Sequence, residues 1–188
     1  VVIALGTHRP MSEEEILKKL GREVVDNYQV VNTPSHKIDE FEYLGESKNG
    51  IPAWVNRTVV EADVRIGIGG ITPHSDAGFS GGAKIILPGV CNDVTVNAFH
   101  ARGASIERNL LGEYEGPMRK DLEAFVEDRI GLDFILNAVI DADCNLYSCV
   151  AGHFIQAHRA GVAFSQALYV VTVERQYPVV IVNSPSEL

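Results

Sequence analysis

The sequence predicts an α/β fold, with a mixed or mostly parallel sheet flanked by helices and a β-hairpin excursion. Two observations favour this class. Short apolar runs with the character of strands alternate along the chain with segments of helical character. The chain also has 188 residues, of which 46% are hydrophobic and 22% charged, which is enough for one domain with a real core.

The first elements are a strand and a helix. Residues 1–5 are predicted to form a buried strand that ends at Gly6. The segment "MSEEEILKKLG" is typical of a helix, because Ser12 is a good N-cap and Glu15 completes a capping box. Gly21 is expected to end this helix.

A hairpin follows in the sequence. Strands are expected at residues 28–32, 40–46 and 51–55. The dipeptide Asn49-Gly50 is a hairpin-turn signal, so the last two strands are expected to pair with each other.

The rest of the chain continues the alternation of strands and helices. The remaining predictions are a short helix at 58–62, a strand at 63–70, a short helix beginning in 81–87, a helix at 92–103, an acidic amphipathic helix at 117–130, a hairpin at 133–152 turning near 141–144, a helix at 153–168, and strands near 169–174 and 178–183. The chain starts without Met in a strand already under way and ends just after another strand, which suggests a fragment or processed piece of a larger protein. Residues 1–175 are interpreted as one domain. Residues 176–188 are interpreted as a linker or the start of a second domain.

Charge and cysteine content restrict the function. A formal net charge of -9 and a pI of about 5.1 argue against nucleic acid or an anionic membrane as partner. No apolar run reaches the roughly 18 residues of a membrane span. Cys91, Cys144 and Cys149 are odd in number and lack C-x-x-C spacing, which indicates free thiols in a reducing, cytoplasmic setting.

The glycine-rich loop "GGITPHSDAGFSGGAKIILPGV" at residues 69–90 is the first candidate site. A strand, then glycines, then a helix start can present bare backbone N–H groups to an anion or cofactor. The phosphate-loop pattern fails, since Ala83 replaces its last glycine and Ile85 replaces the Mg²⁺-binding hydroxyl. Lys84 is then either a solvated surface lysine or a partly desolvated one with a lowered pKa and a role as covalent anchor.

Three histidines accompany this loop. His74 lies at its mouth, and His8 follows the first predicted strand, so both are expected at the carboxyl edge of the sheet, where ligands bind. His100, on the helix after the loop, is as compatible with helix packing as with function. His153 and His158 are five residues apart, about 140° around a helix, and do not form a zincin-type metal pair.

Other chemistry has weaker support in the sequence. Cys91 is near the loop but is better explained as a small buried hydrophobic residue than as a soft ligand. No G-x-S-x-G element is present, which disfavours a serine hydrolase.

Three segments, "GTHRPMSEEE", "TPHSDAGFSGGAKIILPGV" and "NAFHARG", occur in that order. Together they resemble the amino-terminal domain of the nickel-dependent lactate racemase family, over nearly the whole chain. Members of this family use a nickel-pincer nucleotide, a pyridinium mononucleotide with two sulfur arms.

The resemblance implies a role for each matching residue. Lys84 would carry the cofactor through a thioamide, and His100 would complete the coordination of nickel. His8 and His74 would be the two acid/base residues. The cofactor-binding segment before the lysine would comprise Ser80, Gly81 and Gly82.

The resemblance also implies a reaction. Removing hydride from a 2-hydroxy acid gives a flat 2-keto acid, and a histidine on each side can take up the hydroxyl proton and return it. In the family, residues before this segment bind the cofactor phosphate, and a second domain helps to bind substrate. The expected partners are therefore a small 2-hydroxy acid such as lactate, a second domain of the same protein, and cofactor-maturation proteins.

Three alternatives stay open at the level of sequence. A pyridoxal-phosphate enzyme would also place a lysine beside a phosphate-cradling glycine loop. A zinc hydrolase could use His8, His74 and His100 without needing Lys84. A binding or storage module would keep the fold without turnover.

Overall fold

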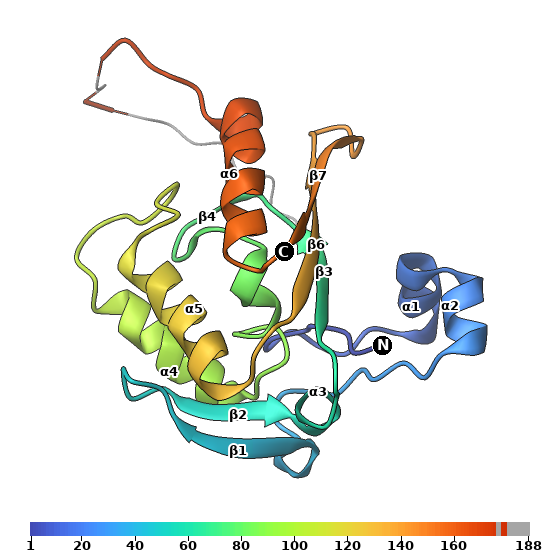
Figure 1. Ribbon diagram of the computed structural model, residues 1–188. Coiled ribbons are helices and arrows are strands. Elements are labelled where there is room, and N and C mark those ends of the chain that lie inside the picture. The colour runs from blue at the N-terminus through green and yellow to red at the C-terminus, as the bar shows by residue number, and fades with distance from the viewer. Residues whose placement is uncertain (176–177, 180–188) are drawn as a thin grey trace.

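The computed structural model describes residues 1–175, 178 and 179, and it confirms the α/β class with a mixed sheet and flanking helices (Figure 1). Its elements are, in order, α1 (Glu13–Leu20), α2 (Arg22–Asn27), η1 (Ile38–Glu40), β1 (Phe41–Glu46), β2 (Pro52–Asn56), α3 (Arg57–Val60), β3 (Ile66–Gly70), β4 (Pro73–His74), β5 (Gly78–Phe79), η2 (Gly82–Ile85), α4 (Asp93–Ala104), α5 (Pro117–Arg129), β6 (Phe134–Ile140), β7 (Leu146–Gly152) and α6 (Gln156–Tyr169). No helix in the described part of the chain has the length and apolar character needed to cross a bilayer.

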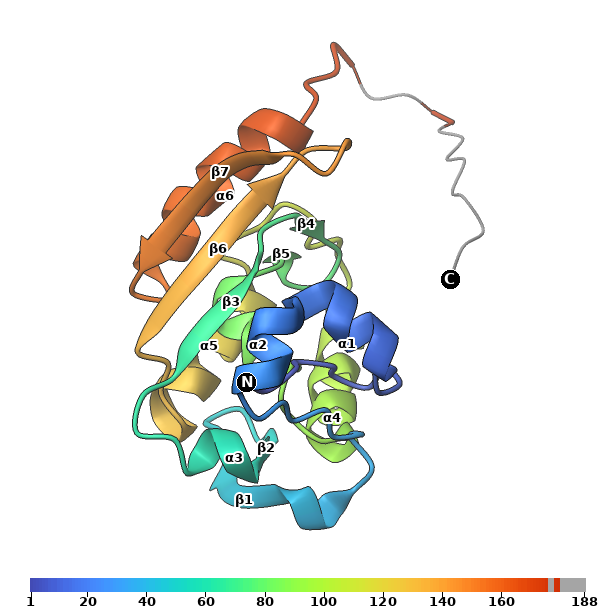
Figure 2. The ribbon, with the colours of Figure 1, turned by 90° about the vertical axis from the view of Figure 1, so that its right-hand side faces the viewer.

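The main sheet has the order β3-β6-β7 (Figure 2). Strands β3 and β6 are parallel, and β6 and β7 form the antiparallel hairpin that the sequence predicts. Helix α6 packs against β6 and β7 on one face of the sheet. The β3–β6 pair brings the start of the glycine loop beside the middle of β6, where Gly69 is opposite Asn137.

Side chains on β6 alternate between the core and solvent. Ile135 and Val139 are completely buried, whereas Phe134 and Leu136 are about two-fifths exposed, at 42% and 40%. This alternation places one apolar face of the strand against the core. The opposite face of the sheet stays open to solvent in the described part of the chain, and Ile68 on β3 extends it at 69% exposure.

Local sequence signals explain the first helix and the first hairpin. In α1, the Ser12 side chain accepts from the Glu15 N–H and the Glu15 carboxylate accepts from the Ser12 N–H, which is the predicted capping box. Strands β1 and β2 pair in an antiparallel hairpin, and its turn contains Gly50 with a φ of 73°. This hairpin packs against α4, and buried residues of β2 are part of the hydrophobic core.

The strands expected at residues 1–5 and 28–32 are not formed as regular elements. The two segments meet only at a single parallel bridge between Val2 and Val31. Beyond it, the Gly6 N–H donates to the Gly89 carbonyl instead of continuing a ladder. Ile3 is buried, so the apolar residues of this segment serve core packing, and its sheet pairing is limited to that one bridge.

The strand expected near 169–174 is also wrong. Helix α6 extends to Tyr169, and residues 170–173 are irregular, with Val171 at 82% exposure. A run of β-branched residues favours a strand only where a partner strand is available. The strand expected near 178–183 lies outside the described residues except for its first two positions, and so does most of the segment 176–188, so that domain boundary stays a prediction.

Candidate active site

A cleft of about 370 Å³ opens where the carboxyl end of β3 meets the loop after residue 5. It is lined by all four side chains that were expected to act: His8, His74, Lys84 and His100. These residues are spread over 93 positions of the sequence, from His8 to His100. Only the fold brings them together.

Each of the four side chains is carried by a different element. His8 follows a tight turn in which its own N–H donates to the Leu5 carbonyl. His74 is in β4, Lys84 in the short helix η2, and His100 in α4, which begins at the N-cap Asn92. His8 and His100 are exposed, whereas His74 and Lys84 are partly buried at the base of the cleft.

The glycine loop is itself folded into a small hairpin, which the sequence did not indicate. Strands β4 and β5 pair, and the Ser80 hydroxyl donates to the Gly70 carbonyl at 2.8 Å. The Ser80 hydroxyl also accepts from the Thr72 N–H at 2.9 Å. Ser80 is therefore occupied in closing the loop, and it does not line the cleft.

The N–H groups that were expected to face an anion are arranged differently. The Gly82 N–H donates to the Asn137 side-chain oxygen at 2.8 Å, and Gly82 does not line the cleft. Gly81 does line it, with a φ of 77°. A Cβ on Gly81 would lie 2.8 Å from that Asn137 oxygen, so this glycine allows a close approach to β6 and not only to a ligand.

Arg119 is hydrogen-bonded to the glycine loop, and the sequence analysis did not predict this contact. Its guanidinium is completely buried and donates to the carbonyls of Ala77, Phe79 and Gly81. An arginine near the start of an amphipathic helix is normally solvated, so nothing in the sequence marks it. Its buried positive charge lowers the pKa of Lys84 and of His74 in the cleft, because electrostatic screening is weak in the protein interior.

The sequence analysis excluded His158 from a zincin-type metal pair, and the structure gives this residue a packing and hydrogen-bonding role. One ring nitrogen, Nε2, is 2.9 Å from the Ser80 carbonyl, and the other is 3.1 Å from the Arg159 guanidinium. Burial, together with the charge of Arg119, lowers the pKa of His158 to about 3. The neutral ring therefore links the glycine loop to α6 through the Ser80 carbonyl. It also packs against Gly82, because a Cβ added to Gly82 would lie 3.0 Å from the His158 ring.

The surroundings of Lys84 agree with a partly desolvated lysine of lowered pKa, whereas its role as covalent anchor stays a prediction. Burial lowers the pKa of Lys84 to about 8, and the Arg119 charge adds to this effect while Asp76 opposes it. The Lys84 ammonium nitrogen is 3.0 Å from Nε2 of His74. The pKa of His74 is also lowered, first by burial and then by the neighbouring Lys84 charge.

His100 and Cys91 differ in their access to the cleft. His100 lines it, whereas Cys91 is buried, with its thiol donating to the Ile86 carbonyl at 3.2 Å. Burial raises the pKa of the Cys91 thiol, which makes it a poor thiolate ligand. Within the described residues, no three His, Cys, Asp or Glu side chains are grouped so that they could hold a metal by themselves. A three-histidine zinc site therefore has no support in this arrangement.

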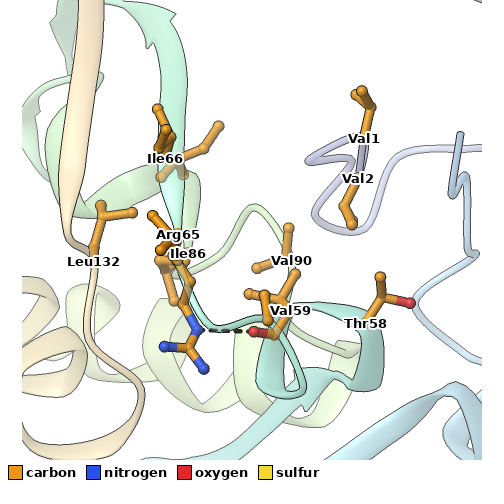
Figure 3. Close-up of a pocket in the computed structure, with 13 residues that line it drawn as sticks. Val1, Val2, Thr58, Val59, Arg65, Ile66, Ile86, Val90 and Leu132 are labelled. Atoms are coloured by element: carbon orange, nitrogen blue, oxygen red, sulfur yellow. Dashed lines mark hydrogen bonds between the residues drawn. The ribbon is translucent and has the colours of Figure 1, made fainter. Parts of the chain in front are cut away.

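A second cavity, of about 270 Å³, lies near the start of β3 (Figure 3). Its walls are mainly valine and isoleucine side chains, with Val1, Val59 and Ile66 among them. The charged side chain there, Arg65, is committed to the Val59 and Val60 carbonyls. Among the described residues of its lining, Thr58 is the other polar side chain, and no histidine, lysine, cysteine or carboxylate lies there to activate it. The histidine–lysine cleft is therefore the candidate active site.

The fold and the cleft together define an α/β domain with a partly buried lysine surrounded by histidines at the end of a sheet strand. Residues 1–111 match the family model for the lactate racemase N-terminal domain, and the chain belongs to this family.

Two curated relatives are similar to almost the whole chain. A lactate racemase from Thermoanaerobacterium thermosaccharolyticum is 33% identical over 93% of this chain, and one from Lactiplantibacillus plantarum is 31% identical over 89%. This chain spans 41% and 40% of the lengths of those relatives.

Solved structures agree with this assignment. The lactate racemase apoprotein from Thermoanaerobacterium thermosaccharolyticum superimposes with a TM-score of 0.81 at 34% identity, over 89% of this chain and 40% of that one. A crystal structure of a Thermotoga maritima protein superimposes with a TM-score of 0.74 at 30% identity, over 93% of this chain and 48% of that one.

Proposed function

We propose that this chain is the catalytic amino-terminal part of a racemase or epimerase of 2-hydroxy acids, with lactate as the first candidate substrate. The observation that carries the proposal is the meeting of His8, His74, Lys84 and His100 in one cleft of a lactate racemase N-terminal domain. The two curated relatives carry the name lactate racemase, which supports the same reaction class.

The residues of the cleft fit a nickel-pincer nucleotide. The volume of about 370 Å³ is in the range of small-molecule sites. Lys84 offers a partly buried amine for covalent attachment, and His100 offers one imidazole for nickel, the remaining donors belonging to the cofactor. When bound, the nickel-pincer nucleotide would supply the reversible removal of hydride from the α-carbon.

The protein residues supply proton transfer and placement. A planar 2-keto acid can be approached from either face, so inversion needs a proton acceptor and donor on each side. His8 and His74 come from separate loops, after residue 5 and after β3, which suits two-sided action. The lowered pKa of His74 keeps this ring neutral near pH 7, as a base that accepts the hydroxyl proton requires.

A further domain is part of this proposal. The chain spans about two-fifths of each curated relative, and His8 and His100 are exposed at the mouth of the cleft. The open apolar face of β3 and β6 is a second surface that another domain could cover. We also propose that maturation proteins load the cofactor and that the protein acts in the cytoplasm, where its free cysteines stay reduced.

The test is an assay of the whole protein, matured with nickel, against a panel of D- and L-2-hydroxy acids. Conversion of one enantiomer to the other, with the mass of the cofactor on a Lys84-containing peptide, supports the proposal. His8→Ala and His74→Ala should each abolish turnover while that mass is retained. Near-normal turnover in either variant would remove that histidine from the mechanism.

The same experiment separates the alternatives. A pyridoxal-phosphate enzyme would show its own absorbance and no nickel, and the Gly82 N–H, already bound to Asn137, argues against a phosphate cradle there. A binding module would retain the ligand without converting it.

A further inference from the structure

Asn137 is a polar residue in the apolar inner face of β6. Ile135 and Val139, its neighbours on that face, are completely buried, and Asn137 itself is only 2% exposed. Burial of an amide away from water costs free energy unless the amide is hydrogen-bonded. The presence of asparagine at this position is therefore explained by the partners of its side chain.

The Asn137 side chain binds the peptide group that joins Gly81 to Gly82. Its side-chain oxygen accepts the Gly82 N–H at 2.8 Å. A backbone N–H only donates, so the amide must present its oxygen to this group. The side-chain nitrogen lies 3.1 Å from the Leu136 carbonyl. The amide is thus held in one orientation between its own strand and the glycine loop.

The same peptide group is also held from α5. The Gly81 carbonyl accepts from the Arg119 guanidinium at 3.1 Å and from the Lys84 N–H at 3.3 Å. Gly81 and Gly82 have φ of 77° and 58°, and glycine adopts positive φ about as readily as negative φ. Because the two glycines have little conformational preference of their own, the contacts to Asn137 and Arg119 select the conformation of this turn.

This peptide group determines where the short helix η2 begins. The helix starts at Gly82, and Lys84 follows two positions later. From there the Lys84 side chain reaches the cleft, where its nitrogen is 3.0 Å from Nε2 of His74. Asn137 lines the same cleft. A rotation of the peptide group would therefore move both the helix start and the lysine.

We propose that Asn137 is a positioning residue that fixes the Gly81–Gly82 peptide group and thereby places the Lys84 side chain beside His74. Its consequence for catalysis rests on the proposed function, in which Lys84 carries the cofactor. The rate of a reaction at a bound group depends steeply on placement, and a displacement of about 1 Å can lower it about 10²-fold. Asn137 thus acts on attachment at Lys84 through the backbone, without touching the reacting atoms.

The experiment compares Asn137→Leu with Asn137→Asp in the 188-residue chain. Leucine has the same branched shape as asparagine and suits the apolar face of β6, but it has no acceptor for the Gly82 N–H. Aspartate retains an oxygen acceptor. Two quantities are measured by NMR: the hydrogen exchange of the Gly82 amide, and the nuclear Overhauser effect between the His74 ring and the Lys84 side chain.

In Asn137→Leu, the Gly82 amide should exchange about 10-fold faster or more than in the unmodified chain, because its acceptor is lost. The Overhauser effect between His74 and Lys84 should disappear in the same variant. In Asn137→Asp, both signals should be retained. An unchanged Overhauser effect in Asn137→Leu, or equal changes in the two variants, would overturn the inference. Asn137→Ala also removes the acceptor and replaces the leucine variant if that variant does not fold.

Asn56→Leu is the matched control. Asn56 is 4% exposed, and its side-chain oxygen accepts the Thr58 N–H at 3.1 Å, but it does not line the cleft. This variant loses a buried hydrogen bond of the same kind at the start of α3, so both NMR signals should stay as they are in the unmodified chain. Loss of the Overhauser effect in this control would show that any loss of stability displaces Lys84, and the specific role of Asn137 would be refuted.

The whole protein provides the functional measurement. During maturation with nickel, the rate at which the cofactor mass appears on the Lys84-containing peptide should fall by at least about 10-fold in Asn137→Leu. An unchanged rate would overturn the inference and leave the proposed function intact. If Lys84 is found unmodified in the active, unsubstituted protein, the proposed attachment fails, while the NMR comparison still decides whether Asn137 places the lysine.

Discussion

Gly81→Ala tests how the glycine loop is built, and the chain offers a matched control for it. Gly81 has φ 77° and ψ −174°, and Gly21, at the end of α1, has φ 80° and ψ 157°. Both lie in the region that is essentially restricted to glycine, so alanine costs each about 1–3 kcal/mol of backbone strain. The substitution reduces the entropy of the unfolded chain equally at both sites.

The two positions differ in what a Cβ would meet. At Gly21, no heavy atom lies within 4 Å. At Gly81, the Cβ would be 2.8 Å from the Asn137 oxygen, 2.8 Å from Ile71 and 3.0 Å from the Gly70 carbonyl. Overlap with a packed, partly backbone environment adds about 1–3 kcal/mol. We expect Gly81→Ala to lower the free energy of unfolding by about 2–6 kcal/mol, against about 1–3 kcal/mol for Gly21→Ala.

The assay is urea denaturation followed by far-UV circular dichroism, with the midpoints compared at a common m-value. Equal losses in the two variants, within about 0.5 kcal/mol, would show that contacts around Gly81 are unimportant and would refute the reasoning.

Three further outcomes follow from the site. The folded state holds His158 neutral with a pKa of about 3, against 6.5 for an ordinary histidine, so its stabilising contribution is present above pH 6.5 and is lost as the pH falls toward 3. We expect this residue alone to cost about 2 kcal/mol of unfolding free energy between pH 6.5 and 4.5, and His158→Gln to flatten a denaturation series over that window. In the whole matured protein, His100→Ala should lower nickel retention more than Cys91→Ala, measured by metal analysis after dialysis; the reverse order would make the cysteine the ligand. The 188-residue chain should give a cooperative melting transition but no racemisation of lactate, and measurable racemisation would show that no further domain is needed.

Local sequence signals anticipated much of the secondary structure because they act over a few residues. The capping box of Ser12 and Glu15, and the Asn49-Gly50 turn, depend on backbone groups no more than a few positions away. They are therefore readable from the chain alone. The predicted strands at 1–5 and 169–174 failed because a regular strand needs a partner along its length; residues 1–5 pair at a single bridge, and apolar composition cannot supply more.

The residue types of the site were also predictable. Histidines after strand ends and a lysine in a glycine loop suggest a cleft at the carboxyl edge of a sheet, and the structure does bring His8, His74 and Lys84 to one cleft. The family resemblance contributed their proposed roles, which position in the sequence could not provide.

Only the tertiary structure decided which groups support those residues. Asn137 is opposite Gly69 because β6 pairs with β3 in one register, and this is what gives the Gly82 N–H its acceptor. Arg119 reaches the loop from a helix more than thirty positions away along the chain, where it supplies the buried charge that lowers the pKa of Lys84. By itself, the sequence determined which chemical groups are available and which local turns carry them. The fold decided which of those groups are desolvated together, because burial and long-range contacts set pKa values and hydrogen-bond partners, and neither is encoded in a local pattern.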